Sequence, residues 1–109
     1  TEIVEDLYNL AKENLKNYNK NYNKFIKLFL SDGSLGLQAY SPFDKIIVTA
    51  ACPEIPSELI KQLKNNGILV APIGKYHQEM LKITKINNEL KTESLGYFVF
   101  VPLKGKYGF

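Results

Sequence analysis

The sequence contains no arginine and no tryptophan, and it has one cysteine and one histidine among its 109 residues. Its formal net charge of +3 therefore comes from lysines, which are spread along the chain rather than clustered. Arginine is the usual bidentate ligand of guanine and of phosphate, so its absence makes a nucleic-acid-binding function a poor hypothesis. We expect no nucleic-acid partner.

The single cysteine, Cys52, excludes an internal disulfide and any metal site built from several cysteines. It also fits a reducing compartment. The only histidine, His77, is expected in a loop beside Lys75 and Tyr76, so no base is paired with the thiol. We therefore expect Cys52 to be a small core residue rather than a nucleophile, and we see no metal-ligand spacing.

Long hydrophobic runs are also missing. No apolar stretch approaches the roughly 18 residues that a membrane-spanning helix needs, and no signal peptide opens the chain. Apolar residues make up 45% and charged residues 23%, as in an ordinary globular domain. The length suffices for one small core but is short for a complete doubly wound enzyme. These features predict a soluble, cytoplasmic protein with no membrane partner.

Hydrophobic periodicity predicts an α/β chain that begins in the middle of a βα unit. The expected elements, in chain order, are a helix over 4–17, a strand over 25–30, a strand over 46–48, a helix from 55–58 to a stop at 66–67, and strands over 68–73, 78–86 and 95–103. The run 46–48 is apolar without alternation, which is typical of a strand covered on both faces.

Short connections predict the order of the last three strands. The link after Gly74 is too short for a parallel crossover, which needs a dozen or more residues, so strand 78–86 should run antiparallel beside strand 68–73. A turn at Asn87-Asn88 then reverses the chain again. Strand 95–103 should therefore be parallel to the main sheet and lie at its outer edge.

Two acidic residues are candidates for nucleotide binding. Glu2 precedes the first helix, where an acid in α/β folds accepts hydrogen bonds from ribose hydroxyls. Asp32 follows strand 25–30 and stands beside Gly33, so it can accept from the adenine amino group while the backbone approaches closely. The residues leave alternatives open: a solvated terminus for Glu2, and a turn aspartate that caps its own loop for Asp32.

Small residues after strand 46–48 are a third candidate feature. Thr49, Ala50 and Ala51 stand where the carboxyl end of a strand lines the ligand crevice of an open α/β sheet, and they would leave room for a ligand. The alternative is a core strand with an ordinary tight exit.

Several motifs in a fixed order closely resemble the protein-L-isoaspartate O-methyltransferase family, from Glu2 to the end of the chain. They are Ser31-Asp32-Gly33-Ser34-Leu35-Gly36, the segment 41–56 that begins Ser41-Pro42-Phe43-Asp44, Gln62-Leu63-Lys64-Asn65-Asn66-Gly67, Gln78-Glu79 and Phe100-Val101-Pro102-Leu103. The resemblance implies a Rossmann-like methyltransferase fold, with a mostly parallel sheet and an antiparallel strand near residues 78–86. It also implies methyl transfer from S-adenosylmethionine to the carboxylate of L-isoaspartyl residues in damaged proteins, a repair reaction that needs no metal.

The resemblance also implies roles for particular residues. Glu2, with Ile3, matches the position that holds the cofactor ribose, and Asp32-Gly33 matches the motif that binds adenine. Lys104 falls near a position that lines the cofactor site. Val101 matches the backbone contact for the substrate peptide.

The sequence departs from the family pattern at several points, and two of them suggest that part of the methyltransferase domain is missing. The glycine-rich loop that cradles the methionine moiety is absent, as is the upstream segment with the serine or threonine associated with methyl transfer, and Ser31 replaces the usual glycine. Residues 1–109 thus resemble the C-terminal part of one methyltransferase domain, with the missing N-terminal half and isoaspartyl proteins as partners. No residue here is assigned as catalytic, and the chain alone is expected to be inactive.

Two alternatives accompany this interpretation. The chain could be a non-catalytic binding module of the same fold, or half of another S-adenosylmethionine-dependent methyltransferase. The motif at 100–103 argues against the second alternative, because it belongs to the substrate side.

Overall fold

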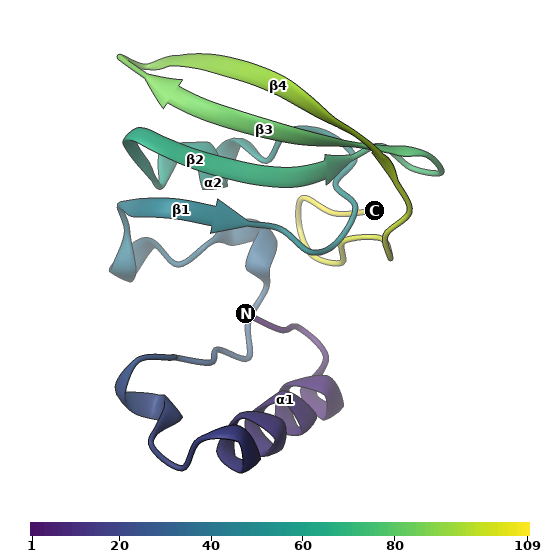
Figure 1. Cartoon of the computed structure of the whole chain (residues 1–109). Coiled ribbons are helices and arrows are strands. Elements are labelled where there is room, and N and C mark those ends of the chain that lie inside the picture. The colour runs from purple at the N-terminus through teal and green to yellow at the C-terminus, as the bar shows by residue number, and fades with distance from the viewer. The chain divides into compact units, whose positions relative to one another are not determined.

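A computed structural model describes residues 1–109 of the chain (Figure 1). The chain forms two compact units, Thr1–Gly33 and Ser34–Phe109, which we call unit 1 and unit 2. No helix in the structure is both long enough and apolar enough to cross a membrane.

Unit 1 consists of one helix and a mostly irregular return segment. Helix α1 spans Glu5–Tyr18, which confirms the helix expected over 4–17, and a 3-10 turn, η1, follows at Tyr22–Lys24. The strand expected over 25–30 is wrong in this chain, because only Leu30 pairs, in a single parallel bridge with Glu2. A strand needs a hydrogen-bonding neighbour along its length, and the short segment around Glu2 supplies one position.

Unit 2 contains a four-stranded sheet with the sequential order β1-β2-β3-β4 (Figure 1). The strands are β1 (Phe43–Ile47), β2 (Leu63–Ile73), β3 (Gln78–Ile86) and β4 (Glu89–Phe98). β1 and β2 are parallel, whereas β3 is antiparallel to both β2 and β4. The predicted order, the antiparallel strand at 78–86 and the last strand at the outer edge are confirmed.

The last strand begins earlier and ends earlier than the range 95–103. Asn87 and Asn88 have positive φ angles of 50° and 65°. A two-residue hairpin turn with positive φ at both central residues matches the twist of the flanking strands, so pairing resumes at once at Glu89. Residues 99–103 continue as an extended segment, in which Pro102 bridges Ala51.

Helix α2 (Ser57–Lys61) covers one face of the sheet and closes the core. The buried cluster consists of Cys52, Leu59, Leu63, Leu69, Ala71 and Ile83. The expectation that the helix runs to 66–67 is wrong, because Leu63 pairs with Phe43 and already belongs to β2. Two short 3-10 turns, η2 (Gly33–Leu35) and η3 (Gln38–Tyr40), precede β1.

Strand β1 is covered on one face only, contrary to the expectation for 46–48. Ile46 and Val48 pack against the core cluster, whereas Ile47 is 73% exposed. β1 is also an edge strand of the sheet in unit 2, since its only strand partner is β2.

Candidate functional site

The Glu2 backbone is fixed beside the segment that leads to Asp32. The N–H of Glu2 donates to the Phe29 carbonyl oxygen at 3.0 Å, and the Ser31 N–H donates to the Glu2 carbonyl oxygen at 2.9 Å. Glu2 is half-buried. The backbone at Glu2 is therefore paired rather than frayed, and Glu2 lies alongside Leu30 and Ser31 within unit 1.

The Glu2 carboxylate lies at the start of α1. Its Oε1 accepts a hydrogen bond from the Val4 N–H at 2.8 Å. Negative charge is favoured at a helix N-terminus, where backbone N–H groups lack helical partners. A carboxylate has about four lone-pair sites, so this bond leaves acceptor capacity for hydroxyl groups of a ligand.

Asp32 and Gly33 follow directly on the bridged segment. Asp32 is half-buried, and a Cβ placed on Gly33 would lie 2.5 Å from the Thr1 hydroxyl oxygen. A side chain at position 33 would therefore require the Thr1 hydroxyl to rotate away. The bridge places the Thr1–Ile3 segment next to the 30–33 segment, with Ile3 42% exposed.

Ser31 stands at the position where the family that this sequence resembles usually has glycine. Its hydroxyl is buried and has no hydrogen-bond partner in the chain. A buried hydroxyl left unpaired costs roughly 1–3 kcal/mol, so it favours the binding of a water molecule or of a polar ligand group.

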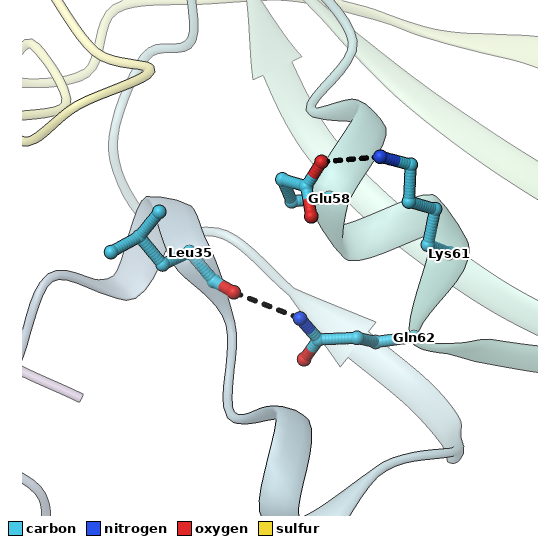
Figure 2. A network of polar contacts seen from close by, with 4 residues as sticks. All are labelled: Leu35, Glu58, Lys61 and Gln62. Atoms are coloured by element: carbon cyan, nitrogen blue, oxygen red, sulfur yellow. Dashed lines mark hydrogen bonds and ion pairs between the residues drawn. The ribbon is translucent and has the colours of Figure 1, made fainter.

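A buried glutamine fixes the loop that precedes β1 (Figure 2). Gln62 is 3% exposed. Its Nε2 donates to the Leu35 carbonyl oxygen at 2.8 Å, as Figure 2 shows, and its Oε1 accepts from the Leu37 N–H at 2.8 Å. Gly36, between them, has a φ of 67°, and a Cβ there would overlap the Gln62 amide. Because both atoms of the amide are used, Gln62 holds one loop conformation.

A second buried glutamine fixes the segment around Val101. Gln78 is 1% exposed. Its Oε1 accepts from the Phe100 N–H at 2.6 Å, and its Nε2 donates to the Lys75 carbonyl oxygen at 3.0 Å. In the sequence, Gln62 and Gln78 stand out only as parts of motifs. No local signal marks their roles, because the backbone groups that pair with the two amides include partners 22–27 residues away in the chain.

Val101 lies in a segment anchored at the carboxyl end of β1. Its carbonyl oxygen accepts from the Ala51 N–H at 2.7 Å, and the Leu103 N–H donates to the Ala51 carbonyl oxygen at 2.8 Å. The Val101 side chain is 70% exposed, and its N–H donates no hydrogen bond within the chain. Lys104, just beyond, is exposed.

The small residues after β1 differ in burial. Ala51 is fully buried and bridges Pro102, whereas Thr49 is exposed. Cys52 is also fully buried, which confirms it as a core residue, and burial raises the pKa of its thiol to about 11. A thiol with so high a pKa is a poor nucleophile at neutral pH. No three His, Cys, Asp or Glu side chains are placed to hold a metal ion.

Comparison with known proteins identifies a single family. The family model described as protein-L-isoaspartate(D-aspartate) O-methyltransferase matches residues 1–108. Among curated proteins of that name, the one from Methanosarcina mazei is 42% identical over 109 residues, covering 99% of this chain and 44% of the relative. The one from Dictyoglomus thermophilum is 44% identical over 110 residues, covering 98% and 48%.

Solved structures agree in fold. A protein-L-isoaspartate O-methyltransferase from Plasmodium falciparum, in complex with S-adenosyl-L-homocysteine, superposes with a TM-score of 0.85 at 32% identity, over 94% of this chain and 50% of that one. A second structure of that name gives a TM-score of 0.82 at 25% identity, over 98% and 34%. The α/β methyltransferase fold class is thus confirmed. The chain spans about half the length of the curated relatives it matches.

Proposed function

The chain belongs to the protein-L-isoaspartate O-methyltransferase family, and from that premise we propose that the protein containing it transfers a methyl group from S-adenosylmethionine to the carboxylate of L-isoaspartyl residues in damaged proteins. The match to the family model over residues 1–108 carries this proposal. It also disfavours the alternative of half of another methyltransferase, because the family match includes the 100–103 motif of the substrate side.

The proposed cofactor site uses the two acids of unit 1. Glu2, with Ile3, would hold the ribose, and Asp32-Gly33 would hold the adenine. For Lys104, a residue of unit 2, the family resemblance alone supports a cofactor contact. The chemistry fits, since carboxylates accept hydrogen bonds from ribose hydroxyls and from an adenine amino group. When bound, S-adenosylmethionine supplies an activated methyl group on its sulfonium.

The proposed substrate contact is the backbone at Val101. It is supported by the Gln78 amide, which fixes Phe100, and by the pairing with Ala51, which fixes the carbonyl side of Val101. The unpaired N–H of Val101 gives a peptide backbone a donor to bind. Backbone contacts carry little side-chain preference, which suits an enzyme that acts on many damaged proteins.

We further propose that residues 1–109 form the C-terminal part of a single methyltransferase domain. The N-terminal part, with the glycine-rich loop, would hold the methionine moiety and carry out methyl transfer, so no residue of this chain is assigned as catalytic. A cytoplasmic location without nucleic-acid or membrane partners completes the proposal. The single unpaired cysteine supports a reducing compartment.

A methylation assay tests the function directly. The full-length protein is incubated with S-adenosylmethionine carrying a labelled methyl group and with an isoaspartyl peptide. The control is the same peptide with ordinary aspartate. We expect base-labile label in the isoaspartyl peptide alone. No transfer, or equal transfer to both peptides, would contradict the proposal and favour a non-catalytic binding module.

A further inference from the structure

Asn66 and Gly67 form the only Asn-Gly pair in the sequence, and the backbone geometry suits both residues. Asn66 has a φ of 64°, a region that asparagine tolerates far better than most residues. A Cβ on Gly67 would lie 2.8 Å from Leu63 Cγ and 2.8 Å from the Lys64 carbonyl oxygen. The structure therefore demands a residue without a side chain directly after a residue suited to positive φ.

The segment that holds this pair is unpaired within the sheet. The ladder with β1 passes from Leu63 to Ile68, and the ladder with β3 begins at Ile68. Asn66 is exposed, and its side-chain amide has no hydrogen-bond partner in the chain. Its neighbour Asn65 differs, because the Asn65 Oδ1 accepts a hydrogen bond from the Asn87 N–H at 2.8 Å. The Asn66 amide is therefore free to rotate toward the following peptide.

We propose that Asn66 is a modification site at which isoaspartate forms spontaneously in the folded chain. The backbone nitrogen of Gly67, after losing its proton to a solvent base, attacks Cγ of Asn66. A bond forms between that nitrogen and Cγ, the Cγ–Nδ2 bond breaks, and ammonia leaves with a proton from solvent. The product is a five-membered succinimide. Glycine favours this step, because no side chain hinders the attacking nitrogen.

Water then opens the succinimide at either carbonyl. When it breaks the bond between the Gly67 nitrogen and the main-chain carbonyl carbon of residue 66, the α-carboxylate is freed and the chain continues through Cγ as isoaspartate. When it breaks the bond to Cγ, ordinary aspartate results. The isoaspartyl form adds one carbon to the backbone and one negative charge between α2 and the paired part of β2.

The modified residue is a group of the kind that the family is named for. That a second copy of the enzyme would methylate it rests on the proposed function. The formation of isoaspartate at residue 66 does not depend on the proposed function. Absence of isoaspartate would therefore refute this inference alone, and absence of methylation would refute the proposed function alone.

The chain offers a matched internal control for this chemistry. Asn88 is exposed and has a φ of 65°, almost the same as Asn66, but it is followed by Glu89. The full chain is incubated in mildly alkaline buffer below its unfolding temperature, and peptide maps with electron-transfer fragmentation separate isoaspartate from aspartate. We expect isoaspartate to accumulate several-fold faster at residue 66 than at residue 88.

Two further samples sharpen the test. The variant Asn66→Gly keeps a residue that tolerates positive φ and removes the amide, so the signal should be lost. A synthetic peptide covering residues 62–70 gives the rate of isoaspartate formation at Asn66 in an unfolded chain. Conversion of that peptide while Asn66 stays intact in the folded chain would overturn the proposal. Equal conversion of Asn66 and Asn88 in the folded chain would overturn it as well.

Discussion

Units 1 and 2 differ in how their apolar side chains are used. Unit 2 buries a continuous cluster that includes Leu59, Leu69 and Ile83. Unit 1 has no fully buried residue, and Leu7 and Leu10 of α1 are 50% and 52% exposed. Unit 2 therefore has a core of its own, whereas unit 1 depends on backbone pairing at a single bridge. Most of the residues proposed to bind the cofactor thus lie in the unit that is less able to stabilise itself.

The largest expected effect is a complete loss of activity in the isolated chain. Neither unit contains the glycine-rich loop proposed to hold the methionine moiety, so the 109-residue chain should not methylate an isoaspartyl peptide. Adding an N-terminal half from a relative should restore transfer. Labelled-methyl incorporation measures both. Turnover by the isolated, mass-verified chain would show that the two units suffice.

A pair of leucine substitutions tests the difference in cores. Leu69 is fully buried, so Leu69→Ala should lower the free energy of unfolding by about 2–5 kcal/mol. Leu10 is 52% exposed, so Leu10→Ala should change it by no more than about 0.5 kcal/mol. Urea unfolding of the full-length protein measures both. Similar losses would mean that α1 packs against a core that unit 1 alone does not show.

A pair of acid substitutions tests the role of unit 1 in cofactor binding. Asp32→Ala should weaken S-adenosylmethionine binding by about 1.5–3 kcal/mol, or about tenfold or more, because a charged acceptor is lost. Glu54→Ala, in an exposed position of unit 2, is the control and should leave the affinity unchanged. Titration calorimetry on the full-length protein measures the two dissociation constants. Equal values would count against the adenine assignment.

A further prediction concerns pH and the core of unit 2. Burial raises the pKa of the Cys52 thiol from its ordinary value of 9.0 to about 11. The folded chain holds this proton more tightly than the unfolded chain, so the stability contribution is full below pH 9 and is lost as the pH rises toward 11. Urea unfolding across this range should show a steeper decline for the wild type than for Cys52→Ala. Parallel declines would contradict the shifted pKa.

Hydrophobic alternation and turn residues predicted the parts of the fold that depend on nearby residues in the chain. Strand β3 runs over 78–86 as expected, since its alternation and the Asn87-Asn88 turn are contained in the sequence itself. The strand predicted over 25–30 was wrong because a strand needs a hydrogen-bonding neighbour along its length. The run 46–48 was predicted to be covered on both faces, but unit 2 covers only one face. The predicted end of α2 was wrong because Leu63 joins the sheet three residues before the Asn66-Gly67 signal.

For the candidate site, too, the sequence shows local features but not contacts between distant residues. Glu2 and Asp32 could be nominated because their chemistry and motif positions are visible in the sequence. Gln62 could not be nominated, because its partners Leu35 and Leu37 are 27 and 25 residues away in the chain. Gln78 is likewise paired with Phe100, 22 residues away. Only the folded chain shows these pairings.

In the proposed enzyme, Asp32 binds the cofactor, and the segment anchored by Gln78 binds the substrate peptide. Steady-state kinetics of the full-length protein test this division of roles with two variants. Asp32→Ala should raise KM for S-adenosylmethionine and leave KM for the isoaspartyl peptide unchanged. Gln78→Leu leaves the Phe100 N–H without its partner and should raise KM for the peptide alone. An increase in the same KM in both variants would contradict the division of roles.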